Sequence, residues 1–530
     1  MKKDLLKKVG KMFVCGFEGI EFSDHARFCS TDLLAGNWIL FSRNVESGTQ
    51  LTELNKELRL RTLENNGFEP FITIDQEGGI VSRLHGNMNY YPGAMACAAA
   101  GLDSIEQTAR IMASHLKQMG INMNLAPVAD INSNPKNPIV GPRSYGDNPL
   151  QVTEAALTAA KAIIDAGIIP VLKHFPGHGD TSTDSHLELP LLPYSFDQLE
   201  QRELIPFIRG IEEDMPAIMV AHMNIPALDD SGLPSSLSKK IITGLLRESL
   251  GFEGLVLTDC LEMNGIRSHY KTADAVRKSL DAGADMLFIS HTPEEQEEGI
   301  KAIYDDLVSG KITESRINRS ISRMETYRKK YCAAAPQSDD GKNIQVSGFT
   351  SWPAEDLSVL RETSRKSLTL VKNDAFFSET GLQDDPRLLI LHLRRPEQFI
   401  GENTVSGGEA VGILKQAFPK AGYRKIKPEE IGKELAEEAV KAEKWDRILV
   451  LCSDLFLHKE AMIFLKRLLK SDTKTAVAVM RTPYEAGEFT DADALILCYE
   501  DTMPAYISLT EFLTGDFKAE GVCPVKIPGL

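Results

Sequence analysis

The 530-residue sequence lacks the long apolar runs that membrane insertion requires. No window holds about 18 uncharged apolar residues, and the N-terminal stretch MKKDLLKKVGKMFVCGF has no apolar core of signal-peptide length. The eight cysteines are scattered without a CxxC pair, so we expect reduced thiols and no zinc site of the usual spacing. These absences favour a cytoplasmic protein. Export by a leader that was removed from the sequence would change this expectation.

Positive charge is also scarce. Lys and Arg number 59 against 75 Asp and Glu, which gives a formal net charge of −16 at pH 7. Nucleic-acid surfaces need clustered basic residues, so we expect no nucleic-acid partner and no anionic membrane surface. The C-terminal half has no GxGxxG or GxxxxGK[ST] pattern, and HExxH and GxSxG are absent. We therefore expect no cofactor, and neither an HExxH-type metalloprotease nor a serine hydrolase of the GxSxG type.

What the sequence does have is an ordinary globular composition, 42% hydrophobic and 25% charged. Its length exceeds what one core normally serves, so two domains are expected. Short apolar runs alternate with charged periodic segments through the first part of the chain. This alternation predicts a parallel sheet, best interpreted as a (β/α)8 TIM-type barrel, with a doubly wound open sheet as the alternative. The expected strands are 12–17, 38–43, 70–77, 122–132, 170–175, 217–227, 254–260 and 286–290.

The composition changes after an amphipathic helix expected over 318–330. Residues 332–353 are small, polar and turn-rich, and are typical of a linker. We therefore predict a catalytic domain at 1–331, a linker at 332–353 and an α/β sandwich domain at 354–530. Within the second domain, apolar runs at 367–371, 387–393, 447–452, 475–480 and 492–499 are the expected strands.

Ionisable residues follow several of the expected strands at the same end, where a barrel presents its functional groups. A single one could be a satisfied core polar group, but five strands with this feature indicate a site. They are Asp75, Asp130, the pair Lys173 and His174, His222, and Asp259.

The richest stretch is 171–186, VLKHFPGHGDTSTDSH. Pro176, Gly177 and Gly179 place His178, Asp184 and His186 on a loop after a strand. A metal site is one interpretation, because His and Asp suit divalent ions, although the spacing fits no simple zinc pattern. The alternative is acid–base chemistry, in which the Asp184 carboxylate raises the pKa of the His186 imidazole. The proton donor would then need a carboxylate from another strand, and Asp75 and Asp259 both qualify, as in glycoside cleavage.

Five segments resemble the glycoside hydrolase family 3 β-N-acetylglucosaminidases, the two-domain, cell-wall-recycling type. The C-terminal part, from KSLTLVKN (366–373) to PVKIPGL (524–530), is similar to that family's second domain. The five segments are FITIDQEGGIVSRL (71–84), NMNLAPVADINSNPKNPIVGPRSYG (122–146), VLKHFPGHGDTSTDSH (171–186), IMVAHMNIPALD (218–229) and GLVLTDCLEM (254–263).

The resemblance implies roles for individual residues. It makes Asp259 the nucleophile and His186 the general acid/base, with Asp184 as the partner of the histidine. It also implies that no metal is needed. The sequence departs from the family at Ile80, where an arginine is common, and at Cys260 directly after the nucleophile. The positions implied to bind the sugar are Asp75, Arg83, Arg143, Lys173 and His174, with His222 near the pocket.

We therefore predict a retaining exo-β-N-acetylglucosaminidase that acts on muropeptides or related glycans, with a small carbohydrate as its partner and an unknown oligomeric state. An N-acetylglucosaminide phosphorylase is the alternative within the same mechanism, because a neutral imidazole would not repel an incoming phosphate as a carboxylate would. A metal-dependent hydrolase and a non-catalytic sugar-binding protein are the alternatives from other classes.

Overall fold

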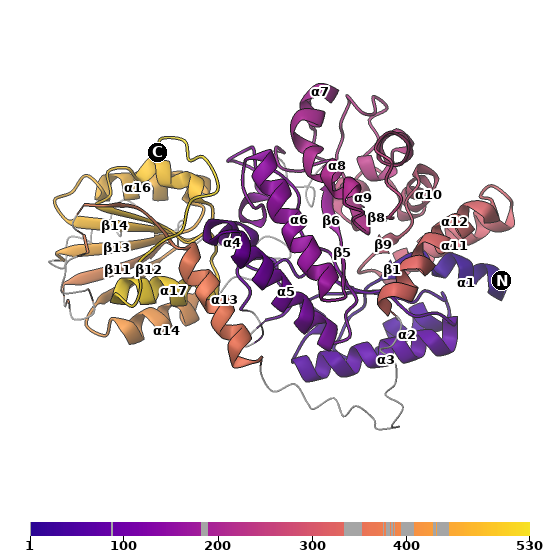
Figure 1. The fold of residues 1–530 in the computed structure, drawn as a ribbon, viewed down its shortest axis with the longest axis horizontal. Coiled ribbons are helices and arrows are strands. Elements are labelled where there is room, and N and C mark those ends of the chain that lie inside the picture. Colours follow the sequence, from indigo (N-terminus) through magenta and orange to yellow (C-terminus); the bar gives the residue numbers. More distant parts are fainter. Residues whose placement is uncertain are drawn as a thin grey trace.

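The computed structural model describes residues 2–85, 88, 90–181, 189–332, 352–374, 376–377, 382, 385, 387–393, 407–427, 431 and 445–530. Figure 1 shows two bodies side by side: a larger one, coloured indigo to rose, and a smaller one, coloured orange to yellow, around the C-terminal sheet. Within the described ranges, no helix is long and apolar enough to cross a membrane.

Two parallel sheets form the centre of the larger body. One has the strand order β5-β4-β3-β2-β1-β9 and the other the order β6-β7-β8. Single parallel bridges link the chain after β4 to β6, at Val128 and Lys173, and β8 to the residue before β9, at Leu257 and Met286. The strands are β1 (Phe13–Cys15), β2 (Asn37–Leu40), β3 (Ile72–Ile74), β4 (Met123–Asn124), β5 (Ile169–Pro170), β6 (Leu172–Phe175), β7 (Ala217–Val220), β8 (Leu255–Thr258) and β9 (Leu287–Ile289).

Helices with local start and stop signals connect these strands. The longest, α3, starts at Ser47, whose hydroxyl accepts a hydrogen bond from the Gln50 amide, and ends at Gly67 in the left-handed region. The helices of this body are α1 (Lys3–Gly10), α2 (Asp24–Thr31), α3 (Gly48–Asn66), α4 (Ala94–Ala100), α5 (Leu102–Gln118), α6 (Pro149–Asp165), α7 (Phe196–Gln198), α8 (Ile205–Glu212), α9 (Asn264–Arg267), α10 (Thr272–Ala282), α11 (Pro293–Val308) and α12 (Glu314–Tyr327), with a further helical segment at Lys240–Ser249.

The smaller body is one sheet covered on both faces, with the order β10-β15-β14-β13-β11-β12 and only β10 antiparallel to its neighbour. Alternate residues of β11 pack on opposite sides: Leu389 and Leu391 share a core with α16, while Leu388 and Ile390 share one with α17. The elements are α13 (Ala354–Ser367), β10 (Thr369–Asn373), β11 (Leu388–Leu393), α14 (Gly407–Ala417), β12 (Gly422–Ile426), β13 (Arg447–Cys452), α16 (Lys459–Leu468), β14 (Lys474–Val479), β15 (Ala494–Leu497) and α17 (Met503–Thr514).

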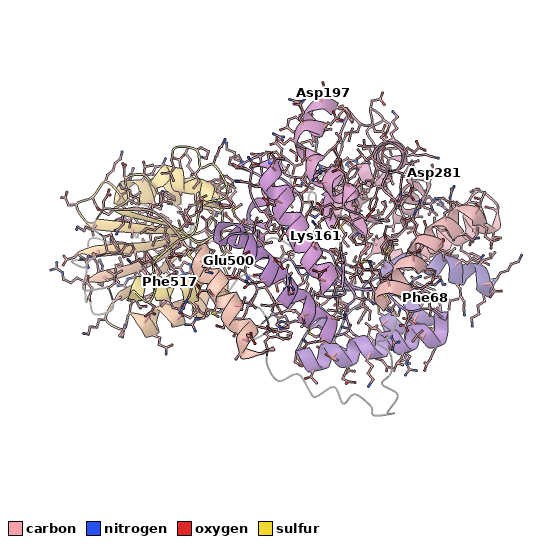
Figure 2. All side chains as sticks on the ribbon, viewed as in Figure 1. Phe68, Lys161, Asp197, Asp281, Glu500 and Phe517 are labelled. Atoms are coloured by element: carbon pink, nitrogen blue, oxygen red, sulfur yellow. The ribbon has the colours of Figure 1, made fainter. Side chains whose placement is uncertain are left out.

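The two bodies meet at buried polar contacts. Glu500, labelled at the junction in Figure 2, accepts a hydrogen bond through Oε2 from the Gly93 amide at 2.9 Å. Asn132 donates through Nδ2 to the Tyr484 hydroxyl at 2.6 Å. The smaller body therefore holds two loop segments of the larger one, the segment at Gly93 and the segment after Asp130.

The strands are shorter than the apolar runs that predict them, and the run at 170–175 is divided between two sheets, with Pro170 in β5 and Leu172 in β6. Of the expected run 122–132, only Met123 and Asn124 are strand. Most of the expected linker, 333–351, lies outside the described residues.

Candidate active site

A cavity of about 440 Å³ lies at the carboxyl ends of the strands of the larger body. Asp75 comes directly after β3, Lys173 and His174 lie in β6, and Asp259 comes directly after β8. Parallel strands gather such groups at one end of a sheet, where sites of this fold class occur. The lining residues are Ile39, Phe41, Ser42, Arg43, Asp75, Glu77, Val81, Arg83, Leu125, Ile139, Arg143, Lys173, His174, His178, Met219, Asp259, Cys260, Met263, Phe288, Ser290 and His291.

A buried ion network forms one wall of this cavity. The Lys173 ammonium, 2% exposed, lies 2.8 Å from Asp75 Oδ1 and 2.6 Å from Glu77 Oε1. Arg143 binds both oxygens of Glu77, through Nε at 2.8 Å and Nη2 at 2.7 Å. Arg83 Nη2 lies 3.5 Å from the other oxygen of Asp75. The network presents fixed charged donors and acceptors, the groups that sugar hydroxyls need as partners.

The charges in this network stabilise one another. Burial by itself raises the pKa of Glu77, but Arg143 and Lys173 outweigh it and hold that pKa far below its ordinary value. Burial lowers the pKa of Lys173, and Asp75 and Glu77 raise it above its ordinary value. Both groups therefore stay charged at neutral pH, and a polar substrate meets a constant electrostatic field.

A second carboxylate, Asp130, organises the loop after β6. Its Oδ2 receives a hydrogen bond from His174 Nδ1 at 2.6 Å, and its Oδ1 accepts from the amides of His174 and His178 at 3.1 and 2.7 Å. Burial opposes ionisation of Asp130, yet His174 and His178 lower its pKa. Burial lowers the pKa of His178 to about 4, so this imidazole is neutral at pH 7. Asp130 thereby fixes the His174 ring with Nε2 toward Arg143, 3.5 Å away.

Asp259 is a partly exposed carboxylate of this cavity, directly after β8. Its Oδ1 accepts from the Cys260 amide at 2.7 Å, and its own amide donates to Val220 in β7. His222 is buried beside it, with Nε2 2.9 Å from the Cys260 carbonyl and Nδ1 2.7 Å from the Ser236 hydroxyl. These bonds hold the backbone on both sides of the Asp259 side chain.

The structure therefore brings together Asp75, Arg83, Arg143, Lys173, His174 and Asp259 as lining residues of one cavity. His222 supports the segment after β8 and does not line that cavity in the part of the chain described. Asp184 and His186 lie outside the described residues.

Sequence reasoning missed Glu77, which links Lys173 to Arg143. The available signal was its position two residues after Asp75 in the same strand-end segment. Phe41 and Arg43 were also missed; the Arg43 guanidinium stacks on the Phe41 ring with 4.4 Å to the ring centre. They directly follow β2, where the same strand-end rule would have placed them.

Three residues beside the cavity form a cluster of metal-ligand type: the ligand atoms of Cys260, Glu262 and His291 lie within 4.8 Å of one another. The Glu262 carboxylate, however, already accepts hydrogen bonds from the amides of His291 and Thr292 at 2.7 and 2.8 Å. Burial raises the pKa of the Cys260 thiol to about 12, which disfavours the thiolate. The cluster is therefore better explained as a support for the turn after β9.

Residues 4–327 match the family described as Glycosyl hydrolase family 3 N terminal domain. A solved glycoside hydrolase family 3 β-N-acetylglucosaminidase from Paenibacillus sp. str. FPU-7 is 32% identical, with a TM-score of 0.88 over 99% of both chains. Beta-hexosaminidase A of Pseudoalteromonas piscicida is 29% identical over 543 residues, 93% of this chain and 89% of the relative. A β-glucoside phosphorylase structure has a TM-score of 0.79 over 100% of this chain and 98% of its own; at 20% identity this likeness concerns the fold alone.

Proposed function

Because this chain belongs to glycoside hydrolase family 3, we propose that it is a retaining exo-β-N-acetylglucosaminidase that removes terminal N-acetylglucosamine from muropeptides or related glycans. The observation that carries this proposal is the position of Asp259, a partly exposed carboxylate in a cavity whose opposite groups form a fixed ion network. The names of the similar proteins, β-N-acetylglucosaminidase and β-hexosaminidase A, support the choice of sugar.

In the proposed first step, an Asp259 oxygen bonds to the anomeric carbon while the glycosidic bond breaks. The leaving oxygen takes its proton from His186, which Asp184 orients. In the second step His186 removes a proton from water, the water oxygen bonds to the anomeric carbon, and Asp259 leaves. Two inversions give retention of configuration. The assignment of His186 and Asp184 rests on the resemblance of the DSH-containing loop to the family.

The terminal sugar is proposed to lie against the ion network. Asp75 and Glu77 supply acceptors for its hydroxyls, and Lys173, Arg143 and Arg83 supply donors. Because Lys173 and Arg143 are already held by carboxylates, they are positioned before the sugar arrives and lose little freedom on binding. We assign His174 to the same subsite and His222 to positioning the backbone beside Asp259.

We also propose that the two sheets of the larger body form one closed (β/α)8 barrel, and that 1–331 and 354–530 are separate domains. The bridges Val128–Lys173 and Leu257–Met286, which join strands of the two sheets, support the first proposal. The C-terminal sheet, whose hydrogen-bonded order contains no strand of the larger body, supports the second. The second domain is then a support and not a source of catalytic groups.

The test is hydrolysis of 4-nitrophenyl β-N-acetylglucosaminide and of 4-nitrophenyl β-glucoside, each with and without EDTA. We expect turnover of the first, much less of the second, and no effect of the chelator. Loss of activity in EDTA would support a metal-dependent hydrolase, and binding without turnover a sugar-binding protein. Repeating the assay in millimolar phosphate distinguishes the phosphorylase alternative, since N-acetylglucosamine 1-phosphate would then replace free N-acetylglucosamine as the main product.

A further inference from the structure

A second cavity, of about 430 Å³, lies at the opposite end of strands β8 and β9 from the candidate active site. We call it the basic pocket. Arg247, in its wall, binds the carbonyl of Gly254 directly before β8, whereas Asp259 follows the same strand. The pocket residues are Lys239, Thr243, Arg247, Glu248, Leu280, Asp281, Gly283, Lys311, Ile312, Thr313, Arg316, Arg319 and Arg323. Asp281 is labelled in Figure 2.

The charge of the basic pocket is opposite to that of the whole chain. Six of its side chains are cationic and two are acidic, in a protein with a net charge of −16. Three of the cations, Arg316, Arg319 and Arg323, are spaced i, i+3, i+7 on α12 and so lie on one face of that helix. Like charges at this spacing repel each other and destabilise a helix. An anionic group bound beside these arginines would therefore stabilise the helix.

The protein supplies only part of this negative charge. Buried Asp285 lies 2.6 Å from Arg247 but 3.4 Å from Arg323. The Lys239–Asp281 distance is 3.4 Å and the Lys311–Asp306 distance is 3.5 Å. Among the residues that the structure describes, no hydrogen bond or ion pair satisfies Arg319. The pKa of Arg316 reflects the excess: burial and the neighbouring arginines lower it to about 10, although Asp285 opposes them.

Two of the arginines build the pocket. Arg316 donates to the carbonyls of Leu280 and Ala284 at 2.7 and 2.8 Å, and Arg247 holds Phe252 and Gly254 in the same way. These bonds fix the walls before any ligand enters. The N-terminus of α12, capped by Thr313, also opens on the pocket and adds the positive end of a helix dipole.

We propose that the basic pocket binds a small molecule carrying one or more phosphate groups. Its volume is that of a small-molecule site, and the arginine fork matches phosphate oxygens. A multiply charged phosphate gains more from several convergent cations than a single carboxylate does. The strong negative charge of the whole chain opposes a long polyanion such as nucleic acid, which would extend beyond the pocket.

The test is isothermal titration of the full-length protein with pyrophosphate at constant ionic strength. We expect saturable binding, and we expect the double variant Arg319→Gln/Lys239→Gln to weaken it roughly tenfold, the value of two exposed ion pairs. Neither side chain holds the backbone in the described structure, so the variant is expected to fold. Its matched control, Lys301→Gln/Lys161→Gln, removes two charges from other helices and should bind as the unmodified protein does.

The cations of the candidate active site could also attract pyrophosphate, and the same variants resolve this. Binding that is weakened by the pocket variant and unaffected by saturating N-acetylglucosamine supports the proposal. Binding that N-acetylglucosamine abolishes, or that both double variants weaken equally, overturns it. No heat change up to 10 mM pyrophosphate, against a control of sodium sulfate, overturns it as well.

Discussion

At the scale of single residues, the candidate active site depends on carboxylates with different surroundings. The Glu77 carboxylate is shared by the cations Lys173 and Arg143, whereas the Asp259 carboxylate, directly after β8, accepts a hydrogen bond from the Cys260 amide. A carboxylate that two cations neutralise is a poor nucleophile. The ion pairs of Glu77 with Lys173 and Arg143 stabilise its negative charge and so lower its reactivity toward carbon. Asp259 directly follows β8 and lines the cavity, with its Oδ1 held by the Cys260 amide at 2.7 Å, and it is the group proposed to attack the carbon atom.

Asp259→Asn should therefore abolish turnover while leaving sugar binding intact. The amide has the shape of the carboxylate but lacks its charge, so kcat should fall by roughly 10³-fold or more. Binding of N-acetylglucosamine, measured by calorimetry, should change little. A 5-fluoro glycosyl inactivator should label the peptide that contains Asp259, and labelling of Asp75 in its place would refute the assignment.

Glu77→Gln should destabilise the fold as well as the site. The substitution leaves Lys173 and Arg143 buried with one carboxylate fewer, and breaking a buried pair costs about 3–5 kcal/mol. KM should rise more than kcat falls, because the network positions the sugar and does not react. Urea unfolding and steady-state kinetics measure the two effects. Glu57→Gln, at an exposed pair on α3, is the matched control; equal losses in both variants would contradict the network argument.

At the scale of elements, sequence reasoning located the strands of the larger body because they lie in buried apolar runs between charged periodic segments; ionisable residues follow five of those runs. Sequence reasoning did not find β12, whose residues are half-buried or exposed, so that edge strand has no apolar run to reveal it. Nor did it find α13, a polar helix that packs on α4 of the other body. The role of Glu77 was missed for a related reason: β3 ends at Ile74, and beyond a strand end the two-residue spacing from Asp75 is only a weak signal that both side chains face the cavity.

The turn that carries Glu77 into the site depends on glycine. Gly78 has φ +91°, and a Cβ built there would lie 2.7 Å from the Pro92 carbonyl oxygen. Gly78→Ala should therefore lower the free energy of unfolding by more than the roughly 1–2 kcal/mol that an alanine in the left-handed region costs. It should also raise KM, because it displaces Glu77. Gly232→Ala is the matched control, because Gly232 has φ +78° with open space around it. Equal destabilisation and unchanged KM would mean that the close contact at Pro92 has no effect.

At the scale of the whole molecule, the two bodies are joined by a carboxyl group that resists ionisation. Glu500 is 2% exposed and accepts from the Gly93 amide; burial raises its pKa to about 7. Gly93 packs on Gly79 in the turn beside Glu77, and a Cβ at Gly79 would lie 2.7 Å from the Gly93 Cα. The Glu500 side chain is thus connected, through Gly93 and Gly79, to the turn that carries Glu77.

Glu500→Gln should make the protein less sensitive to alkaline pH. The folded state holds the Glu500 proton up to about pH 7, whereas an unfolded glutamate releases it near pH 4.3. The contribution of Glu500 to stability is therefore complete below about pH 4 and is lost as the pH rises through 7, by on the order of 3 kcal/mol. Glutamine keeps an acceptor for the Gly93 amide and does not titrate.

The measurement is the urea midpoint of wild type and variant at pH 5.5 and 8. At pH 8 the urea midpoint of Glu500→Gln should rise relative to that of the wild type. The midpoint of Glu297→Gln, a substitution at an exposed position, should equal that of the wild type at both pH values. Glu77 and Asp130 do not contribute to the difference, because their lowered pKa values place their titration below this window. If the gap between Glu500→Gln and the wild type were the same at pH 5.5 and 8, the junction carboxyl would be ionised already in the folded protein, and Gly93 would be held by a carboxylate.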